Sequence, residues 1–264
     1  MTKFELRNQD CVVGMRAMSE MSVDLVVTSP PYNLGIRYSK FSDDQARGEY
    51  LRWCRDWTGE VHRLLRSDGS FFLNIGASPS NPMLPHELLL QLRECFVLQN
   101  TIHWIKSIAL PDDEGAMISR GHFKPINSPR FLNDCHEYIF HLTKSGDVKI
   151  DRLALGVPYQ DKSNISRWSH TAGNDLRCRG NTWFVAYPTI KSRDKQRPHP
   201  ATFPVELAEN CIRLHGLKCV KTMLDPFLGI GNSAMAARRC SIPHFVGFEI
   251  DHAYINDAQR RVAE

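Results

Sequence analysis

Apolar and amphipathic stretches alternate along the chain, and this alternation predicts strands that alternate with helices. Residues 23–29, VDLVVTS, have the continuous apolar character of a strand buried on both faces of a parallel sheet. Residues 46–66 place their apolar side chains at helical spacing, so we expect a helix whose Tyr50, Trp53 and Trp57 pack in the core rather than against a ligand. The pattern indicates βαβ units, a mainly parallel sheet and the α/β class.

The same pattern predicts most of the remaining elements. Before residue 144 we expect strands at 4–10, 70–76, 96–106 and 135–143, helices at 11–21 and 84–95, and a turn at 67–69. After residue 202 we expect helices at 203–216, 232–240 and 253–264, and strands at 220–226 and 244–251. Gly216 should end the first of these helices, and Asn232 or Ser233 should cap the second. From Lys144 to about Lys195 the regularity is lost, so this stretch separates two βα-rich halves.

Composition places the chain among ordinary globular proteins. Its 264 residues are enough for one large α/β domain, with 42% hydrophobic and 23% charged residues. No apolar stretch is long enough for a membrane span, and the mixed charges at the start do not fit a signal peptide, so we expect a cytoplasmic protein. The eight cysteines are scattered without a C-x-x-C pair, which favours reduced thiols and gives no zinc pattern.

Positive charge is concentrated in the irregular middle of the chain. Residues 120–200 hold 14 lysines and arginines against 7 aspartates and glutamates. Aromatic residues lie among these charges: Phe123, Phe131, Trp168, Trp183 and Tyr187. Such a segment suits a polyanion such as nucleic acid, and a solvated loop of chance composition would give the same count.

Two prolines follow Ser29 directly at the exit of the predicted 23–29 strand. Pro30 and Pro31 fix the backbone twice and remove two amide donors, so the segment up to Tyr32 leaves the sheet rigidly. A plain proline-rich turn and the rigid frame of an active site are both consistent with this stretch.

A glycine turn joins a strand to a helix in the second half, in the sequence DPFLGIGNS. Gly229 and Gly231 allow a ligand to approach the backbone, and a side chain at Gly231 is expected to enter the ligand's space. Glu249 stands 18 residues past Gly231, at the end of the next strand, where a carboxylate can accept hydrogen bonds from a ribose. An adenosine-containing ligand is indicated, either S-adenosylmethionine or a nicotinamide dinucleotide, and a tight βα turn without a ligand is the alternative.

In this order, TSPPYN and DPFLGIGNS resemble the catalytic and cofactor motifs of the DNA amino-methyltransferases, the cytosine-N4 and adenine-N6 family with the β-order of motifs. The likeness extends over about residues 4–145 and 181–264. It implies a Rossmann-like S-adenosylmethionine-dependent methyltransferase fold with an inserted target-recognition region. The parts are then a catalytic half at 1–110, a basic recognition region at 111–195 that includes the strand near 135–143, and a cofactor half at 196–264.

The resemblance also implies roles for individual residues. The catalytic set is Ser29, Pro30, Pro31 and Tyr32, in which the Ser29 hydroxyl and the Pro30 carbonyl accept hydrogen bonds from the target amino group while Tyr32 stacks on the flipped base. The cofactor set is Asp10, Thr28, Phe203, Pro204, Asp225, Pro226, Phe227, Gly229, Gly231, Asn232, Ser233 and Glu249. Ser233 replaces the threonine of many members, and its hydroxyl can serve the same purpose.

Serine at the first position of the catalytic motif resembles the cytosine-N4 branch, with adenine N6 as the alternative target. Double-stranded DNA is the implied partner, with a homodimer and a cognate restriction endonuclease compatible with the family. The predicted DNA contacts are Arg167, Arg177, Arg179, Arg193 and Arg197. The chain has no Pro-Cys dipeptide for a covalent attack on cytosine C5. Three alternatives stay open: an RNA substrate, an inactive DNA-binding module, and a nicotinamide oxidoreductase, which would leave TSPPY without a role.

Overall fold

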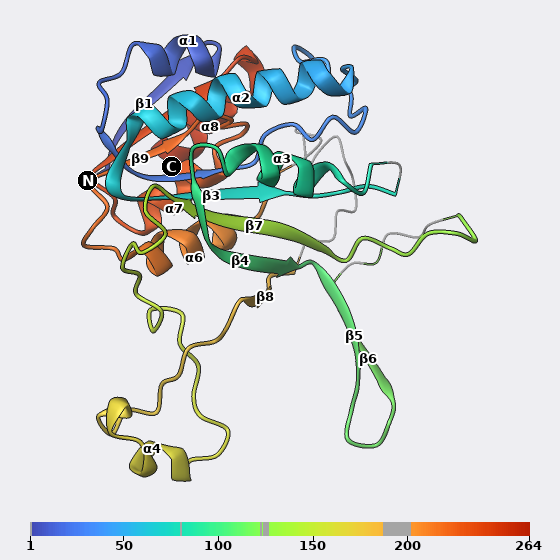
Figure 1. The fold of residues 1–264 in the computed structure, drawn as a ribbon, viewed down its shortest axis with the longest axis vertical. Coiled ribbons are helices and arrows are strands. Elements are labelled where there is room, and N and C mark those ends of the chain that lie inside the picture. The colour runs from blue at the N-terminus through green and yellow to red at the C-terminus, as the bar shows by residue number, and fades with distance from the viewer. Residues whose placement is uncertain (1, 80, 122, 124–126, 187–201) are drawn as a thin grey trace.

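The fold is built on one sheet of eight strands in the order β1-β10-β9-β2-β3-β7-β4-β8 (Figure 1). A computed structural model describes residues 2–79, 81–121, 123, 127–186 and 202–264. The strands of the sheet are β1 (Lys3–Asn8), β2 (Val23–Thr28), β3 (Leu65–Ile75), β4 (Val97–Ile105), β7 (His136–Thr143), β8 (Thr182–Phe184), β9 (Thr222–Asp225) and β10 (His244–Glu249). A separate two-stranded sheet pairs β5 (Ser107–Pro111) with β6 (Met117–Gly121).

The sheet joins the two halves of the chain. β2, from the first half, pairs in parallel with β3 on one side and with β9, from the second half, on the other. Only β7 runs antiparallel to its neighbours β3 and β4 among the strands of this sheet that the structure describes. The α/β class with a mainly parallel sheet is confirmed, while the proposed boundaries at residues 110 and 195 stay a prediction.

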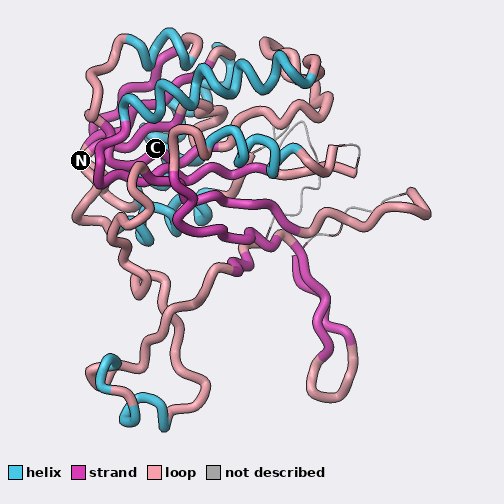
Figure 2. The backbone as a smooth tube through the Cα atoms, viewed as in Figure 1, coloured by secondary structure: helices cyan, strands magenta, loops and turns pink. Residues whose placement is uncertain are grey.

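Helices cover both faces of the sheet (Figure 2). One face carries α1 (Cys11–Arg16), α2 (Arg47–Leu64) and α3 (Leu84–Leu92), and the other carries α6 (Val205–His215), α7 (Asn232–Arg239) and α8 (His252–Ala263). The apolar run of β2 explains this arrangement, because Val26 packs in the first layer while Leu25 and Val27 pack in the second. Among the described residues, no helix has the length and apolar character needed to cross a membrane.

Two local expectations are wrong, and one element was not expected. The predicted turn at 67–69 is a bulge inside β3: Val23 pairs with Leu65 and Leu25 pairs with Ser70, so the register shifts between these two pairs. The residue before α7 is Gly231, with a positive φ of 83° and no side-chain cap, so neither Asn232 nor Ser233 caps that helix. The β5–β6 hairpin was not expected, because its exposed strands lack an alternating apolar pattern.

The β5–β6 hairpin projects from the body in Figure 1. A second extension carries α4 (Ser163–Arg167) and a short 3₁₀ helix, Ser169–Thr171. The second extension begins after Thr143, the end of β7, and the chain returns to the sheet at β8. The irregular stretch predicted after residue 144 therefore includes one strand of the main sheet as well as a projecting lobe.

A buried polar group ties β3, β7 and α6 together away from the SPPY motif. The hydroxyl of Ser70 lies 2.9 Å from Nε2 of His141 and 2.9 Å from Nδ1 of His215. The amide of Asn100 donates to Nδ1 of His141 over 2.9 Å, so the neutral imidazole is satisfied on both nitrogens. Burial lowers the pKa of His141 from 6.5 to about 3 and also lowers the pKa of His215.

We predict that this group makes stability depend on pH. The unfolded chain binds a proton at His141 near pH 6.5 and the folded chain does not, so stability is complete above that pH and falls as the pH drops toward 3. His141→Gln should reduce the slope by up to about 1.4 kcal/mol per pH unit in that window. Urea unfolding at several pH values measures both slopes, and equal slopes would show that His141 is not kept neutral by the fold.

Candidate active site

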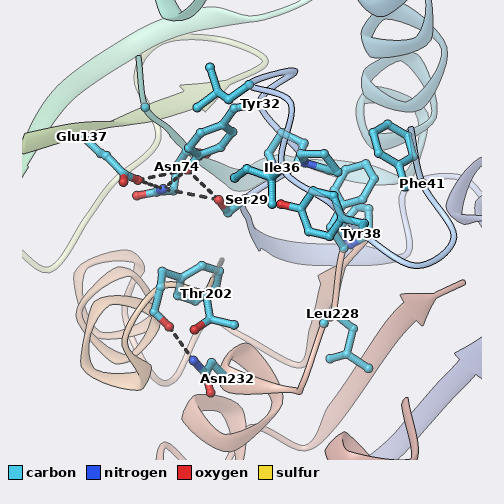
Figure 3. A pocket seen from close by; sticks show the side chains of 18 of the residues that line it. Ser29, Tyr32, Ile36, Tyr38, Phe41, Asn74, Glu137, Thr202, Leu228 and Asn232 are labelled. Atoms are coloured by element: carbon cyan, nitrogen blue, oxygen red, sulfur yellow. Dashed lines mark hydrogen bonds between the residues drawn. The ribbon is translucent and has the colours of Figure 1, made fainter. Parts of the chain in front are cut away.

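A cavity of about 940 Å³ lies where the two sequence motifs meet. It is lined from one side by Ser29 to Tyr32, which follow β2, and from the other by Gly229 and Glu249, which follow β9 and end β10. These strands are parallel, so their carboxyl ends share one edge of the sheet, where ligands of α/β folds bind. Figure 3 shows side chains from both sides of this cavity.

Buried groups hold the proline motif and the loop behind it. The hydroxyl of Tyr50 on α2 donates to the Pro31 carbonyl over 2.7 Å. The carboxylate of Asp43, only 3% exposed, accepts from the backbone N–H groups of Asn33, Leu34 and Ile36 at 2.8, 3.1 and 3.0 Å. The stiff exit predicted from the two prolines is therefore reinforced from behind by α2 and by the loop that precedes it.

A polar cluster surrounds Ser29 on the cavity wall (Figure 3). The Ser29 hydroxyl lies 2.7 Å from the Tyr32 hydroxyl, which lies 3.0 Å from Oε2 of Glu137 on β7. The amide of Asn74 on β3 donates to Oε2 of Glu137 over 2.6 Å and forms a very short hydrogen bond with Tyr32. Lys106 pairs with Oε1 of Glu137 at 3.1 Å. β3 and β7, which lie outside the SPPY motif, therefore supply the polar partners of Ser29 and Tyr32.

The direction of these hydrogen bonds follows from the groups themselves. An amide nitrogen only donates and a carboxylate only accepts, so Tyr32 accepts from the Asn74 amide and donates to Glu137 at 3.0 Å, with the Asn74 carbonyl as a longer acceptor at 3.3 Å. Ser29 then donates to the remaining lone pair of Tyr32. The Ser29 oxygen accepts a long bond of 3.4 Å from the Asn74 amide, which leaves its other lone pair free to accept. Burial, reinforced by the charge of Glu137, raises the pKa of Tyr32 well above 10, so the phenol stays protonated.

The glycine turn is held by the acid predicted to bind a ribose. Oε2 of Glu249 accepts from the Gly229 N–H over 2.9 Å, and Oε1 accepts from the Asp251 N–H over 2.8 Å. Gly229 has a positive φ of 54°, which favours glycine. Burial raises the pKa of Glu249 above its usual range. Each carboxylate oxygen keeps a free lone pair, so Glu249 can position the turn and still accept from a ligand.

Asp225 holds the glycine turn through hydrogen bonds and does not line the cavity. It is fully buried and accepts from the Thr28 hydroxyl over 2.5 Å, from the Phe227 N–H over 3.0 Å and from the Ser233 hydroxyl through a very short bond. Burial raises its pKa to about 6. This group links the start of the SPPY motif to the glycine turn, which explains why the two motifs keep their relative position.

The structure brings together most of the predicted site residues. Eleven of them line the cavity: Ser29, Pro30, Pro31, Tyr32, Asp10, Phe203, Pro226, Phe227, Gly229, Asn232 and Glu249. The others of the cofactor set lie outside its lining: Thr28, Pro204, Asp225, Gly231 and Ser233. Arg167, Arg177 and Arg179 lie on the projecting lobe, away from the cavity. Arg193 and Arg197 lie outside the described residues.

The interpretation of Gly231 needs a correction. A Cβ at this position would lie 2.9 Å from Cβ of Ala258 on α8, and φ is 83°. A side chain there would therefore press on α8 rather than enter a ligand's space. The glycine is required by helix packing and by its backbone conformation, while a cofactor contact through its backbone stays a prediction.

Sequence reasoning missed several residues of the cavity. Asn74, Lys106 and Glu137 come from β3, the end of β4 and β7, and the nearest signal was a charged residue at the start of the apolar strand HEYIFHLT. Trp53 was expected in the core; it packs against the core and also lines the cavity, with its ring centroid 5.4 Å from that of Phe227. Core packing is confirmed for Tyr50 and Trp57, whose side chains are fully buried.

Known proteins resemble this chain in sequence and in fold. The type II methyltransferase M.ScaI of Streptomyces caespitosus is 29% identical, over 97% of this chain and 80% of the relative. The cytosine-N4-specific PvuII DNA methyltransferase gives a TM-score of 0.67 at 18% identity, over 99% of this chain and 87% of its own. TTHA0409 of Thermus thermophilus, solved in complex with S-adenosyl-L-methionine, gives a TM-score of 0.64 at 24% identity, over 99% and 93%. That complex agrees with the cofactor predicted from the sequence.

The strongest of these findings concerns the chain as a whole. The family model of DNA methylases that act on N6 and N4 amino groups matches residues 23–260, which include the SPPY motif, the glycine turn and the strand of Glu137. The chain therefore belongs to this DNA methylase family.

Proposed function

We propose that this chain transfers a methyl group from S-adenosylmethionine to the exocyclic N4 of a cytosine flipped out of double-stranded DNA. The observation that carries the proposal is the Ser29 oxygen, left as an acceptor on the wall of the cavity that also contains Glu249. No described residue donates to the Pro30 carbonyl oxygen, so it is a second acceptor beside Ser29. Serine at this position supports cytosine N4, and adenine N6 is the alternative target on the same two acceptors.

The residues around the glycine turn fit the cofactor. S-adenosylmethionine supplies an electrophilic methyl group on a sulfonium. Glu249 would hold the ribose hydroxyls, and the N–H groups beside Gly229 can approach a polar group closely. Phe227, Phe203 and Ile250 give this part of the cavity apolar surface for the adenine ring. The cavity is large enough for this molecule and a nucleobase together, which a site for the cofactor alone would not need.

The SPPY side would prepare the amino group. The lone pair of a cytosine N4 is delocalised into the ring, which makes this nitrogen a weak nucleophile. Hydrogen bonds from its two N–H groups to Ser29 and to the Pro30 carbonyl would draw the nitrogen toward sp³ geometry and free the lone pair. The rigid frame keeps both acceptors in place, and the half-buried ring of Tyr32 offers a face for stacking.

Equilibrium dialysis tests the cofactor assignment against the nicotinamide alternative. We expect the protein to retain labelled S-adenosylmethionine and not labelled NAD, and then to transfer the label to unmethylated duplex DNA. Binding of NAD alone would support an oxidoreductase. Binding of S-adenosylmethionine without transfer of the label to DNA or RNA would support an inactive binding module. Transfer of the label to RNA alone would contradict DNA as the substrate. Action in the cytoplasm, a homodimer and a restriction partner remain predictions.

The projecting lobe gives a further prediction, about DNA binding. Arg167 and Arg177 are exposed and Arg179 is half-buried, so all three can neutralise phosphates. Replacing one phosphate contact with alanine should weaken binding to all sequences and reduce the salt slope of log K by roughly one unit. Replacing an arginine that contacts a base edge should instead reduce the sequence specificity at one base pair of the recognition site.

Binding titrations at several salt concentrations, on specific and scrambled duplexes, separate these outcomes. Arg55→Ala is the matched control, because Arg55 is exposed on α2, in the helical layer that covers one face of the sheet. Alanine variants of the three lobe arginines that keep wild-type affinity and salt slope would show that the lobe is a solvated loop.

A further inference from the structure

A continuous chain of hydrogen bonds leads from Ser29 away from the cavity. Ser29 donates to Tyr32 over 2.7 Å, and Tyr32 donates to Oε2 of Glu137 over 3.0 Å. Lys106 holds the other carboxylate oxygen at 3.1 Å. Gly76 permits this close packing, since a Cβ there would lie 3.1 Å from the Tyr32 ring and 3.0 Å from Cγ of Glu137. The chain ends on a carboxylate that is not part of the SPPY motif.

Stacking does not explain this arrangement. The face of the Tyr32 ring would stack equally well without a hydroxyl, as in phenylalanine. Here the hydroxyl takes its full set of hydrogen bonds, with Ser29 and the Asn74 amide as donors and Glu137 at 3.0 Å as the nearer acceptor, ahead of the Asn74 carbonyl at 3.3 Å. The orientation of every bond in the chain is the one that passes a proton outward from Ser29.

Methylation of an amino group produces a proton that must leave. The nitrogen lone pair forms the new N–C bond while the S–C bond breaks, and the nitrogen then carries a positive charge. It becomes neutral only when it loses one of its N–H protons. An exposed site could lose that proton to water. A base stacked on Tyr32 and bonded to Ser29 would displace water from this part of the cavity, so a protein group would be needed to accept the proton.

We propose that Glu137 receives the proton of the target amino group through Ser29 and Tyr32, without touching the base itself. The proposal rests on the proposed function. The N–H proton passes to the Ser29 oxygen as Ser29 gives its own proton to Tyr32 and Tyr32 gives its proton to Glu137. The nitrogen becomes neutral, Glu137 becomes a neutral acid, and no other reactant is consumed. Glu137 then returns the proton to solvent after turnover.

The surroundings of the chain agree with these roles. The ammonium of Lys106 lies 3.1 Å from Oε1 of Glu137 and holds the carboxylate in place, so that Oε2 faces Tyr32. The pKa of Tyr32 is raised by burial, so the phenol exchanges one proton for another and does not become a phenolate. Asn74 donates to both Tyr32 and Glu137 and fixes the distance between them.

The test measures single-turnover methyl transfer to unmethylated DNA, in H2O and in D2O, for the wild type, Tyr32→Phe, Glu137→Gln and the double variant. Each single variant should lose on the order of 10²-fold in rate while keeping cofactor affinity. The double variant should lose no more than either single one, because both changes break the same chain. The wild-type rate should fall in D2O, since protons move along the chain, and Glu137→Gln should lose this solvent isotope effect.

Tyr138→Phe is the matched control, because Tyr138 neighbours Glu137 on β7 and does not line the cavity. It should keep the wild-type rate and solvent isotope effect. Additive losses in the double variant, or a solvent isotope effect that survives in Glu137→Gln, would overturn the relay. A wild type that transfers no methyl group would instead contradict the proposed function, so the two failures are distinguishable.

Discussion

Replacing Ser29 with alanine should lower the rate of methyl transfer on the order of 10²-fold, the usual cost of removing one transition-state hydrogen bond. The Ser29 hydroxyl is bonded to Tyr32, and we propose that its oxygen accepts from the target amino group. The affinity for S-adenosylmethionine should not change, because the hydrogen bonds of the Ser29 hydroxyl go to Tyr32 and Asn74 and not to Glu249 or the glycine turn. Single-turnover transfer and calorimetric titration of the cofactor measure the two quantities separately.

Ser22→Ala is the control for this change, because Ser22 precedes the opposite end of β2 and its hydroxyl donates to the Ser19 carbonyl. It should transfer methyl groups at the wild-type rate. A Ser29→Ala variant that also turns over at the wild-type rate would remove Ser29 from the mechanism and leave the Pro30 carbonyl as the sole acceptor.

The second large effect is expected at Glu249. Replacing it with alanine removes the acceptor of the Gly229 and Asp251 N–H groups together with the proposed ribose contacts. We expect S-adenosylmethionine to bind on the order of 10²-fold more weakly, from the loss of hydrogen bonds to a charged group. The raised pKa of Glu249 also predicts a pH dependence. The affinity of the wild type for S-adenosylmethionine should fall as the pH drops, because Glu249 is protonated at a higher pH than an ordinary glutamate.

Gly231→Val separates a cofactor effect from a folding effect. Its side chain would meet Ala258, and its φ of 83° is strained for a branched residue, so it should lose roughly 3 kcal/mol of stability. The folded fraction should still bind the cofactor. Urea unfolding and calorimetry on the same samples give both values. Unchanged affinity in Glu249→Ala would contradict the ribose assignment, and a stable Gly231→Val protein without affinity would contradict the packing account.

The parts of this molecule that could be predicted from its sequence are those with local signals. The apolar run of β2 is a signal contained within a few residues, and with the alternation of strands and helices it correctly predicted a mainly parallel sheet. The glycines at 229 and 231 likewise correctly predicted a turn between a strand and a helix. Gly216 ends α6 as expected, with a positive φ of 108°. These features depend on backbone geometry that a short stretch of sequence determines.

The missed features depend on contacts between distant segments. Glu137 reaches the cavity because β7 runs antiparallel, which brings its first residues to the carboxyl end of β3. Nothing in its neighbouring sequence specifies that direction. The bulge at 66–69 looked like a turn because Gly69 follows Asp68, but pairing with β2 keeps the strand continuous. Gly231 seemed to serve a ligand because the residue it packs against, Ala258, is remote in sequence.

The most direct test of the account is the identity of the product base. The wild-type protein is incubated with S-adenosylmethionine labelled in its methyl group and DNA from a host without DNA methyltransferases. The DNA is then digested to nucleosides and analysed by mass spectrometry. The account predicts labelled N4-methyldeoxycytidine. Labelled N6-methyldeoxyadenosine would contradict the target atom, and labelled 5-methyldeoxycytidine or no labelled nucleoside at all would contradict the central claim.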